Sequence, residues 1–435
     1  MATRARLGAD VTKAVIISNG LDTNGQNARY VEAARKHGKD EGVLSVLAVG
    51  RDDPAAVVTR YRLAAQKYGH LHIREAHRHN HYFEWPHDMT WGKMVDRCPQ
   101  HPPKTCQTTD RQLKALANQA DVIHLNNSEI AYRLFHLKKP ALLHHHGSLF
   151  RNNPQYMLDM ARRYKMVQAV STIDLLRFAP DQLTWLPSAY DIDEMQAFAK
   201  ANGRKPDGRV RIVHCPTNRE LKHTHVLEAA VAELKREGLP VDLEIVEFRP
   251  WRESLAAKAK ADIVYDQLTW GYGCNGIEAM AMGKPLIAGA DDWTIDAMLR
   301  QWGVLPFFQT TETDFLHHLR VMVKDKSVRK EYAHRGLGHV RKYHDELPAL
   351  TKLAELYSEA IDTYYAQRIP GKGNINPEAV TFRKVKSGAV FDLEGNEIAF
   401  TDGRITTDDP LVVHRLRTLA KRPARFGIKE GEDVA

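Results

Sequence analysis

Residues 261–290 read ADIVYDQLTWGYGCNGIEAMAMGKPLIAGA, and this stretch decides the fold. Its ends, residues 261–265 and 285–288, are short apolar runs typical of buried strands in a parallel sheet. Residues 276–282 between them predict a crossover helix, so the stretch is a βαβ unit. The loop before the helix is rich in glycine, which lets backbone N–H groups approach a ligand, and a helix N-terminus favours anions.

The side chains of this loop and helix indicate what the ligand is. Glu278 lies about one turn inside the helix, where its carboxylate can accept hydrogen bonds from a ribose. A nucleotide is therefore the natural ligand, although a glycine-rich turn of this kind also occurs as plain structure. The predicted donor-binding residues here are Trp270, Gly271, Tyr272, Gly273 and Glu278.

The segment GYGCNGIEAMAMGKPLIAG resembles the signature of retaining GT-B glycosyltransferases, of the family 4-like group that includes sucrose synthases and bacterial mannosyltransferases. In that pattern two glutamates stand eight residues apart, the second on the nucleotide ribose and the first near the donor sugar. Glu278 matches the second glutamate. Trp270 stands in place of the first, which leaves open which sugar is held and how.

Length and composition set outer bounds on the fold. The chain has 435 residues, of which 43% are hydrophobic, enough for two domains and an extension. A net charge of +8 suits phosphorylated ligands, nucleic acid or an anionic membrane, but on a chain this long it is also typical of an ordinary solvated surface. The four cysteines are few and scattered, and no apolar run reaches 18 residues. We therefore expect a cytoplasmic protein with no transmembrane segment.

The first half of the chain predicts a doubly wound α/β domain. Apolar runs at residues 14–18, 43–49, 121–125, 141–145 and 165–170 alternate with helical segments. The loop after the first run contains Gly20, Asn24 and Gly25, which can approach a sugar or a phosphate. The resemblance extends over residues 14–367 and implies an acceptor-side Rossmann-like domain at residues 1–200.

A second α/β series follows a linker-like stretch at residues 201–207. Runs at 210–215 and 241–246 precede the βαβ unit, so residues 201–345 form the predicted nucleotide-sugar domain, which faces the first across a cleft. Residues 346–369 predict a helix that crosses back to the first domain. Residues 370–435 predict an appended α+β module, with strands at 380–385, 389–393 and 398–401 and a helix at 411–420. Its FTDGRITTDD turn resembles small appended domains of phage structural proteins, which implies a phage-encoded enzyme and a docking partner for this module.

Two basic residues are candidates for contact with the diphosphate. Lys222 lies between a strand and a helix start, and it matches the lysine of the family's GRLxxxKG motif. The arginine of that motif stands five residues before the lysine, whereas Arg219 stands three before it. For each side chain the alternative is an ordinary solvated surface residue, and this alternative weighs more for Arg219 than for Lys222.

Histidines form two clusters. His146 in HHHGS aligns with the histidine of the family's TVHG segment, near the transferred sugar, and a buried structural role is the alternative. Strand geometry puts His144 and His146 on one face and His145 on the other, which argues against three ligands on one metal ion. A second cluster has spacings that match no common zinc motif, so a loop that shapes an acceptor pocket is the preferred interpretation; it contains His77, His79, His81, His87, Cys98, His101 and Cys106.

Together with the residues, the resemblance implies a retaining hexosyltransferase of the GT-B fold that uses a nucleotide diphosphate sugar. The resemblance implies that the leaving diphosphate helps deprotonate the acceptor, and that Lys222 and helix dipoles replace a metal ion, so we expect no metal site and no cofactor. Removal of Lys222 or Glu278 should then weaken donor use without unfolding the chain. The acceptor stays open among a protein, a glycan, a lipid and a modified base. Alternatives are an epimerase or phosphorylase on the same fold and a non-catalytic carbohydrate-binding or virion-associated protein.

Overall fold

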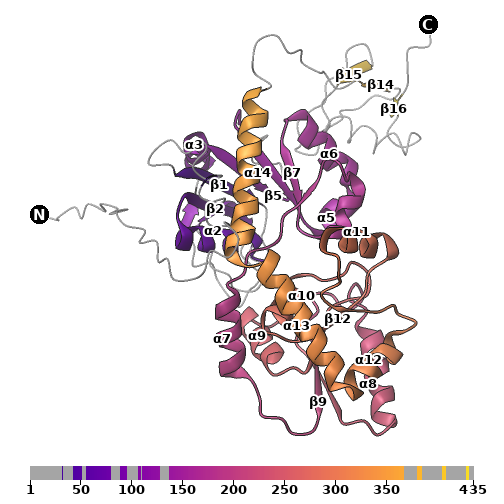
Figure 1. The fold of residues 1–435 in the computed structure, drawn as a ribbon. Helices are drawn as coiled ribbons and strands as arrows, with labels where there is room; N and C mark the ends of the chain where they lie inside the picture. Colours follow the sequence, from indigo (N-terminus) through magenta and orange to yellow (C-terminus); the bar gives the residue numbers. More distant parts are fainter. Residues whose placement is uncertain are drawn as a thin grey trace, which may run out of the picture.

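The computed structural model describes residues 32, 43–50, 55–79, 89–95, 106–108, 110–127, 137–366, 380–384, 404–407 and 428–430. Two lobes, each built on a parallel sheet, lie one above the other in Figure 1. The strand predicted at residues 14–18 and the loop containing Gly20, Asn24 and Gly25 lie outside the described residues.

The first lobe is built on an eight-stranded sheet. Its order is β4-β3-β2-β1-β5-β6-β7-β8, and every neighbouring pair is parallel. The strands are β1 (Leu44–Gly50), β2 (Leu71–His79), β3 (Met89–Val95), β4 (Cys106–Thr108), β5 (Val122–Asn126), β6 (Ala141–His145), β7 (Val167–Val170) and β8 (Thr184–Trp185). The predicted strands at β1, β5, β6 and β7 are confirmed to within two residues. The predicted loop excursion is wrong for β2, β3 and β4, because the histidine-rich region extends the sheet edge.

Helices cover both faces of this sheet. They are α2 (Val57–Tyr68), α3 (Asp110–Gln119), α5 (Gly147–Asn152), α6 (Pro154–Arg163), the short 3-10 helix η1 (Ile173–Phe178) and α14 (Glu346–Ala366). Tyr61 of α2 and Tyr357 of α14 are fully buried in one apolar cluster with β1 and β6 residues. Helix α14 thus runs from the second lobe along the first, as Figure 1 shows in orange.

The second lobe contains a five-stranded parallel sheet in the order β10-β9-β11-β12-β13. Its strands are β9 (Val210–His214), β10 (Val241–Ile245), β11 (Ile263–Tyr265), β12 (Leu286–Ala288) and β13 (Phe308–Gln309). Its helices are α8 (Thr224–Arg236), α9 (Trp251–Ala259), α10 (Cys274–Ala281), α11 (Asp292–Trp302), α12 (Phe315–Lys324) and α13 (Lys326–Tyr343), and α7 (Ile192–Asn202) precedes them. The βαβ unit predicted from residues 261–290 is confirmed as β11, α10 and β12.

The described part of the tail is a small antiparallel sheet in the order β15-β14-β16. Strand β14 (Val380–Lys384) matches a predicted strand, whereas β15 (Arg404–Thr407) and β16 (Ile428–Glu430) were not predicted. The strands predicted at 389–393 and 398–401 and the helix predicted at 411–420 lie outside the described residues.

Each parallel sheet reverses its strand order once. In the first lobe the order in which strands are added reverses between β1 and β5, and in the second lobe it reverses between β9 and β11. Ligands of doubly wound sheets bind at the carboxyl ends of the strands at such a switch point. Gly50 ends β1 there, and a Cβ at this position would lie 2.9 Å from the Cβ of Asn126. The fold therefore predicts that residues just after these four strands line a ligand site.

Candidate active site

A cavity of about 730 Å³ lies between the two lobes, a size typical of small-molecule sites. The first lobe contributes Asn126 at the end of β5 and Asn127 after it, and the second contributes Cys215 after β9 and Gln267 after β11. These positions are the carboxyl ends of strands at the two switch points. The same cavity is lined by His146, Lys222, Trp270, Tyr272, Gly273 and Glu278, all predicted site residues.

Glu278 lies at the wall of this cavity and is almost completely buried. Its Oε1 accepts hydrogen bonds from Arg60 Nη2 at 3.1 Å and from Trp251 Nε1 at 2.8 Å, and its Oε2 accepts from Lys258 Nζ at 2.6 Å. Arg60 comes from α2 in the first lobe, 218 residues away. Glu278 is therefore part of the contact between the lobes as well as of the cavity.

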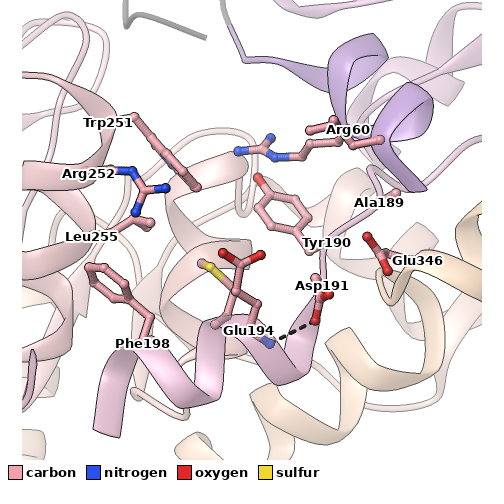
Figure 2. A pocket seen from close by; sticks show the side chains of 12 residues that line it. Arg60, Ala189, Tyr190, Asp191, Glu194, Phe198, Trp251, Arg252, Leu255 and Glu346 are labelled. Atoms are coloured by element: carbon pink, nitrogen blue, oxygen red, sulfur yellow. Dashed lines mark hydrogen bonds between the residues drawn. The ribbon is translucent and has the colours of Figure 1, made fainter. Parts of the chain in front are cut away.

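Arg60 is itself held by aromatic side chains. Figure 2 shows its guanidinium group between Trp251 and Tyr190, whose ring centroids lie 5.9 Å and 3.9 Å away. Such cation–π contacts favour a charged guanidinium. Arg60 and Trp251 separate the large cavity from the smaller one drawn in Figure 2, since both line each of them.

Lys258 is the other cation on Glu278, and its side chain is fully buried. It also donates to Asn275 Oδ1 at 2.7 Å. Burial lowers the pKa of Lys258, but the Glu278 charge raises it and prevails, so the lysine stays protonated. Two cations thus share one carboxylate in the wall of the cavity.

Lys222 pairs with Asp266, a fully buried carboxylate that follows β11. Lys222 Nζ donates to Asp266 Oδ1 at 2.8 Å, and the Gly273 N–H donates to Asp266 Oδ2 at 2.6 Å. Burial raises the pKa of Asp266, but the Lys222 charge and these two hydrogen bonds outweigh it and lower the pKa overall. Asp266 therefore stays ionised and brings Lys222 to the N-terminus of α10.

Helix α10 begins at Cys274 without an acidic residue in its first turn and without a side-chain cap. The backbone N–H groups of Cys274, Asn275 and Gly276 make no hydrogen bond within the described part of the chain. Unpaired amides at a helix N-terminus attract anions, and Lys222 adds a positive charge beside them.

The glycine-rich loop is held from both sides. Gly271 has φ +79°, a conformation that favours glycine, and its N–H donates to the Gly289 carbonyl at 2.8 Å. The Tyr272 hydroxyl bonds to the Nε2 atoms of His339 and His344 at 2.7 Å and 3.0 Å. Tyr272 therefore fixes the loop against the end of α13, and Trp270 reaches the first lobe, where the Arg151 guanidinium lies 4.3 Å from its ring centroid.

Arg219 lies outside the cavity between the lobes. Its side chain is half exposed and pairs with Glu228 at 3.0 Å and with Glu247 at 2.7 Å. It is not among the residues that line the cavity. The structure thus directs Arg219 away from the cavity that Lys222 lines, although the two residues stand only three positions apart in the sequence.

His146 lines the cavity at the end of β6, and its Nε2 has no hydrogen-bond partner among the described residues. Its ring lies 4.1 Å from that of His144, while His145 stacks on Phe150 at 4.0 Å. The predicted alternation of these three histidines is confirmed. Burial, and then the neighbouring histidines, lower the pKa of His146 to about 3, so its imidazole is neutral at pH 7.

Several side chains of the site were not predicted, among them Arg60, Arg151, Trp251 and Asp266. Asp266 carried a signal, because it directly follows a predicted strand of the βαβ unit. Arg60, Arg151 and Trp251 lie on helices whose register against the cavity depends on tertiary packing.

No group of three or more histidine, cysteine or acidic side chains that could hold a metal ion occurs within the described residues. Of the second histidine cluster, the structure describes the side chain of His77 alone; the side chains of the rest lie outside it. None of the helices in the described part of the chain is both long enough and apolar enough to cross a membrane.

The fold of this chain is similar to those of several solved structures. Anabaena Alr3699/HepE in complex with UDP superposes with a TM-score of 0.51 at 14% identity, over 73% of this chain and 100% of that chain. Its complex with UDP and glucose gives 0.50 at 14% identity, over 73% and 99%. Sucrose-phosphate synthase (tll1590) from Thermosynechococcus elongatus gives 0.49 at 14%, over 73% and 98%. No protein-family profile and no curated protein matches the sequence.

The chain has a GT-B fold. Two Rossmann-like parallel sheets face each other across the cavity, in agreement with the fold class predicted from the sequence.

Proposed function

We propose that this protein is a glycosyltransferase that transfers a sugar from a nucleotide diphosphate sugar to an acceptor. The observation that carries the proposal is the convergence of Lys222 and the N-terminus of α10 on one edge of the cavity between the lobes. An ammonium group has three donors, and Asp266 uses one of them. The two that remain, together with the unpaired amides of α10, suit the oxygens of a diphosphate.

Glu278 is proposed to accept a hydrogen bond from the ribose. Its two oxygens offer about four acceptor positions, and Arg60, Trp251 and Lys258 occupy three of them. One position remains for a hydroxyl group. In this proposal residues 201–345 hold the nucleotide and residues 1–200 present the acceptor.

We propose that transfer retains the anomeric configuration, and the support is the scarcity of basic groups among the described residues of the cavity. Among the described residues that line the cavity, Glu278 is the sole carboxylate, and three donors already hold it. The neutral His146 imidazole is too weak a base to lead the reaction. We therefore propose front-face transfer in which the leaving diphosphate takes the acceptor proton, while His146 contacts the sugar.

We propose that Lys222 and the N-terminus of α10 stabilise the negative charge of the diphosphate, so that transfer needs no metal ion. We further propose a cytoplasmic protein in which the tail from residue 370 docks to the acceptor or to a larger assembly. A hexose unit as the transferred group agrees with the size of the cavity.

Thermal denaturation with a panel of nucleoside diphosphates tests the site first, because a ligand that binds only the folded state raises the melting temperature. Lys222→Gln should abolish the shift, and Arg209→Gln is the matched control, since Arg209 forms an exposed pair with Asp242. Incubation of the matching nucleotide sugar with candidate acceptors, followed by NMR of the product anomer, tests transfer and retention. Failure of every nucleoside diphosphate to stabilise the protein would contradict the proposal.

A further inference from the structure

Arg151 is an enclosed cation in the cavity, on the side of the first lobe. It lies on α5, its side chain is 18% exposed, and its Nε donates to the buried Asp174 Oδ2 at 2.8 Å. The face of its guanidinium group packs on the ring of Trp270 from the second lobe, 4.3 Å from the centroid. The buried carboxylate and the indole together fix the orientation of the guanidinium group.

The two terminal nitrogens of Arg151 are unused. Within the described part of the chain, neither Nη1 nor Nη2 makes a hydrogen bond, because the contacts of Arg151 are its Nε bond and its stack on Trp270. The other enclosed cations of the site, Arg60 and Lys222, each donate to a buried carboxylate through their terminal nitrogens. Arg249 also lines the cavity, but its side chain is largely exposed.

Arg151 and the proposed diphosphate site line the same cavity. Trp270, the partner of Arg151, stands three residues before Gly273, so these two backbone positions lie at most about 10 Å apart. A hexose bonded to the β-phosphate extends from the diphosphate site into the cavity that the Trp270 ring and Arg151 also line. The cavity is continuous between the two places, since Arg151, Trp270, Gly273 and Lys222 all line it.

We propose that the donor sugar is a hexuronate and that Arg151 binds its carboxylate through Nη1 and Nη2. The inference rests on the proposed function and names the substrate class of the same site. A planar guanidinium group whose two terminal nitrogens are free matches the two oxygens of a carboxylate, and this bidentate geometry is the strongest pairing that arginine makes. A neutral hexose places one hydroxyl group there and leaves donors of an enclosed charge unsatisfied.

The test compares a hexose and a hexuronate on the same nucleotide. The nucleoside diphosphate that most raises the melting temperature is identified first, and calorimetry then compares UDP-glucose with UDP-glucuronic acid, or GDP-mannose with GDP-mannuronic acid. The wild type should bind the hexuronate about 10- to 100-fold more tightly, as expected for charge-assisted hydrogen bonds. Arg151→Gln should remove that ratio without changing the affinity for the free nucleoside diphosphate, and Arg151→Lys should restore part of it.

Arg177→Gln is the matched control. Arg177 also joins the lobes, through Asp291 at 2.8 Å, but it is not among the residues that line the cavity. This variant should keep the full ratio. Equal affinity for the two sugars, or an equal loss of both in Arg151→Gln, would mean that Arg151 only braces the lobes and would overturn the inference while the transferase proposal stands. If no nucleoside diphosphate binds at all, both are wrong.

Discussion

Glu278→Gln is expected to destabilise the second lobe strongly, since Glu278 neutralises a buried lysine. Lys258 is fully buried and donates to Glu278 Oε2 at 2.6 Å, with Asn275 as its other acceptor. Removal of one partner of a buried ion pair costs about 3–5 kcal/mol, because it leaves the other charge unpaired. A loss of that size lowers the melting temperature by roughly 10 °C in a domain of this size.

The assay is thermal and urea denaturation of the full chain, compared with two further variants. Lys258→Met with Glu278→Gln removes both charges of the pair, and this double variant should recover part of the lost stability, because no unpaired lysine stays buried while Arg60 keeps an amide oxygen at position 278 as an acceptor. Asp242→Asn breaks an exposed pair with Arg209 and should change the free energy of unfolding by less than about 1 kcal/mol.

A Glu278→Gln variant that melts within 1–2 °C of the wild type, roughly the size of a surface effect, would refute this reasoning. So would a double variant as unstable as the sum of its single changes. The expectation from sequence alone that Glu278 can be removed without effect on the fold does not agree with the contacts in the structure, because sequence does not show that Lys258 depends on it.

The remaining predictions concern catalysis, pH, metal and the tail. Lys222→Ala should lower kcat about 10- to 100-fold, the value of a charge-assisted hydrogen bond to the leaving diphosphate, and steady-state kinetics with a check of the melting temperature measures it. The melting temperature should be highest above pH 6.5 and should fall as the pH is lowered toward 4. Burial lowers the pKa of several histidines to about 3 to 4, below the unfolded value of 6.5, so the unfolded chain binds more protons than the folded chain in that range. These residues are His124, His145, His146, His214 and His344. A flat profile over this range would argue against their burial. Transfer should persist in excess EDTA; loss of activity that only a divalent ion restores would contradict metal independence. Truncation after Lys372 should keep nucleotide binding and reduce transfer to the native acceptor, and aggregation of the truncated chain would show that the tail belongs to the core.

Sequence was sufficient for the parts of the fold that local pattern determines. Strands β6 and β12 are predicted by short apolar runs, and helix α10 is predicted by the glycine-rich turn before it. Each of these signals lies within a short stretch of sequence. Strands β3 (MTWGKMV) and β4 (CQT) were not predicted, because their mixed polar and apolar sequences lack the continuous apolar run of a central strand. They extend one edge of the sheet, and β4 itself has a neighbouring strand on one side only, so the usual signal is weak.

The candidate site was predictable up to the point where long-range packing begins. Glu278, Lys222 and His146 each follow a strand or start a helix, and all three line the cavity. What these residues contact was not predictable, since Arg60 is 218 residues away from Glu278 and reaches it only through the contact between the two lobes. Arg219 shows the converse: it matches a motif approximately, yet the turn before α8 directs it to the carboxylates of Glu228 and Glu247.

The net charge around the cavity differs from what the sequence of the glycine-rich loop suggests. As a sequence, the glycine-rich loop and its helix contribute a single acid, Glu278, which alone would repel a diphosphate. In the structure Glu278 is shared by Arg60 and Lys258, so this group of three side chains carries one net positive charge. Lys222 and Asp266 cancel each other, and Arg151 and Asp174 do the same. The enclosed wall of the cavity is therefore positive by about one charge before any ligand enters, and because buried charges are weakly screened, an anionic ligand gains more from it than a neutral sugar does.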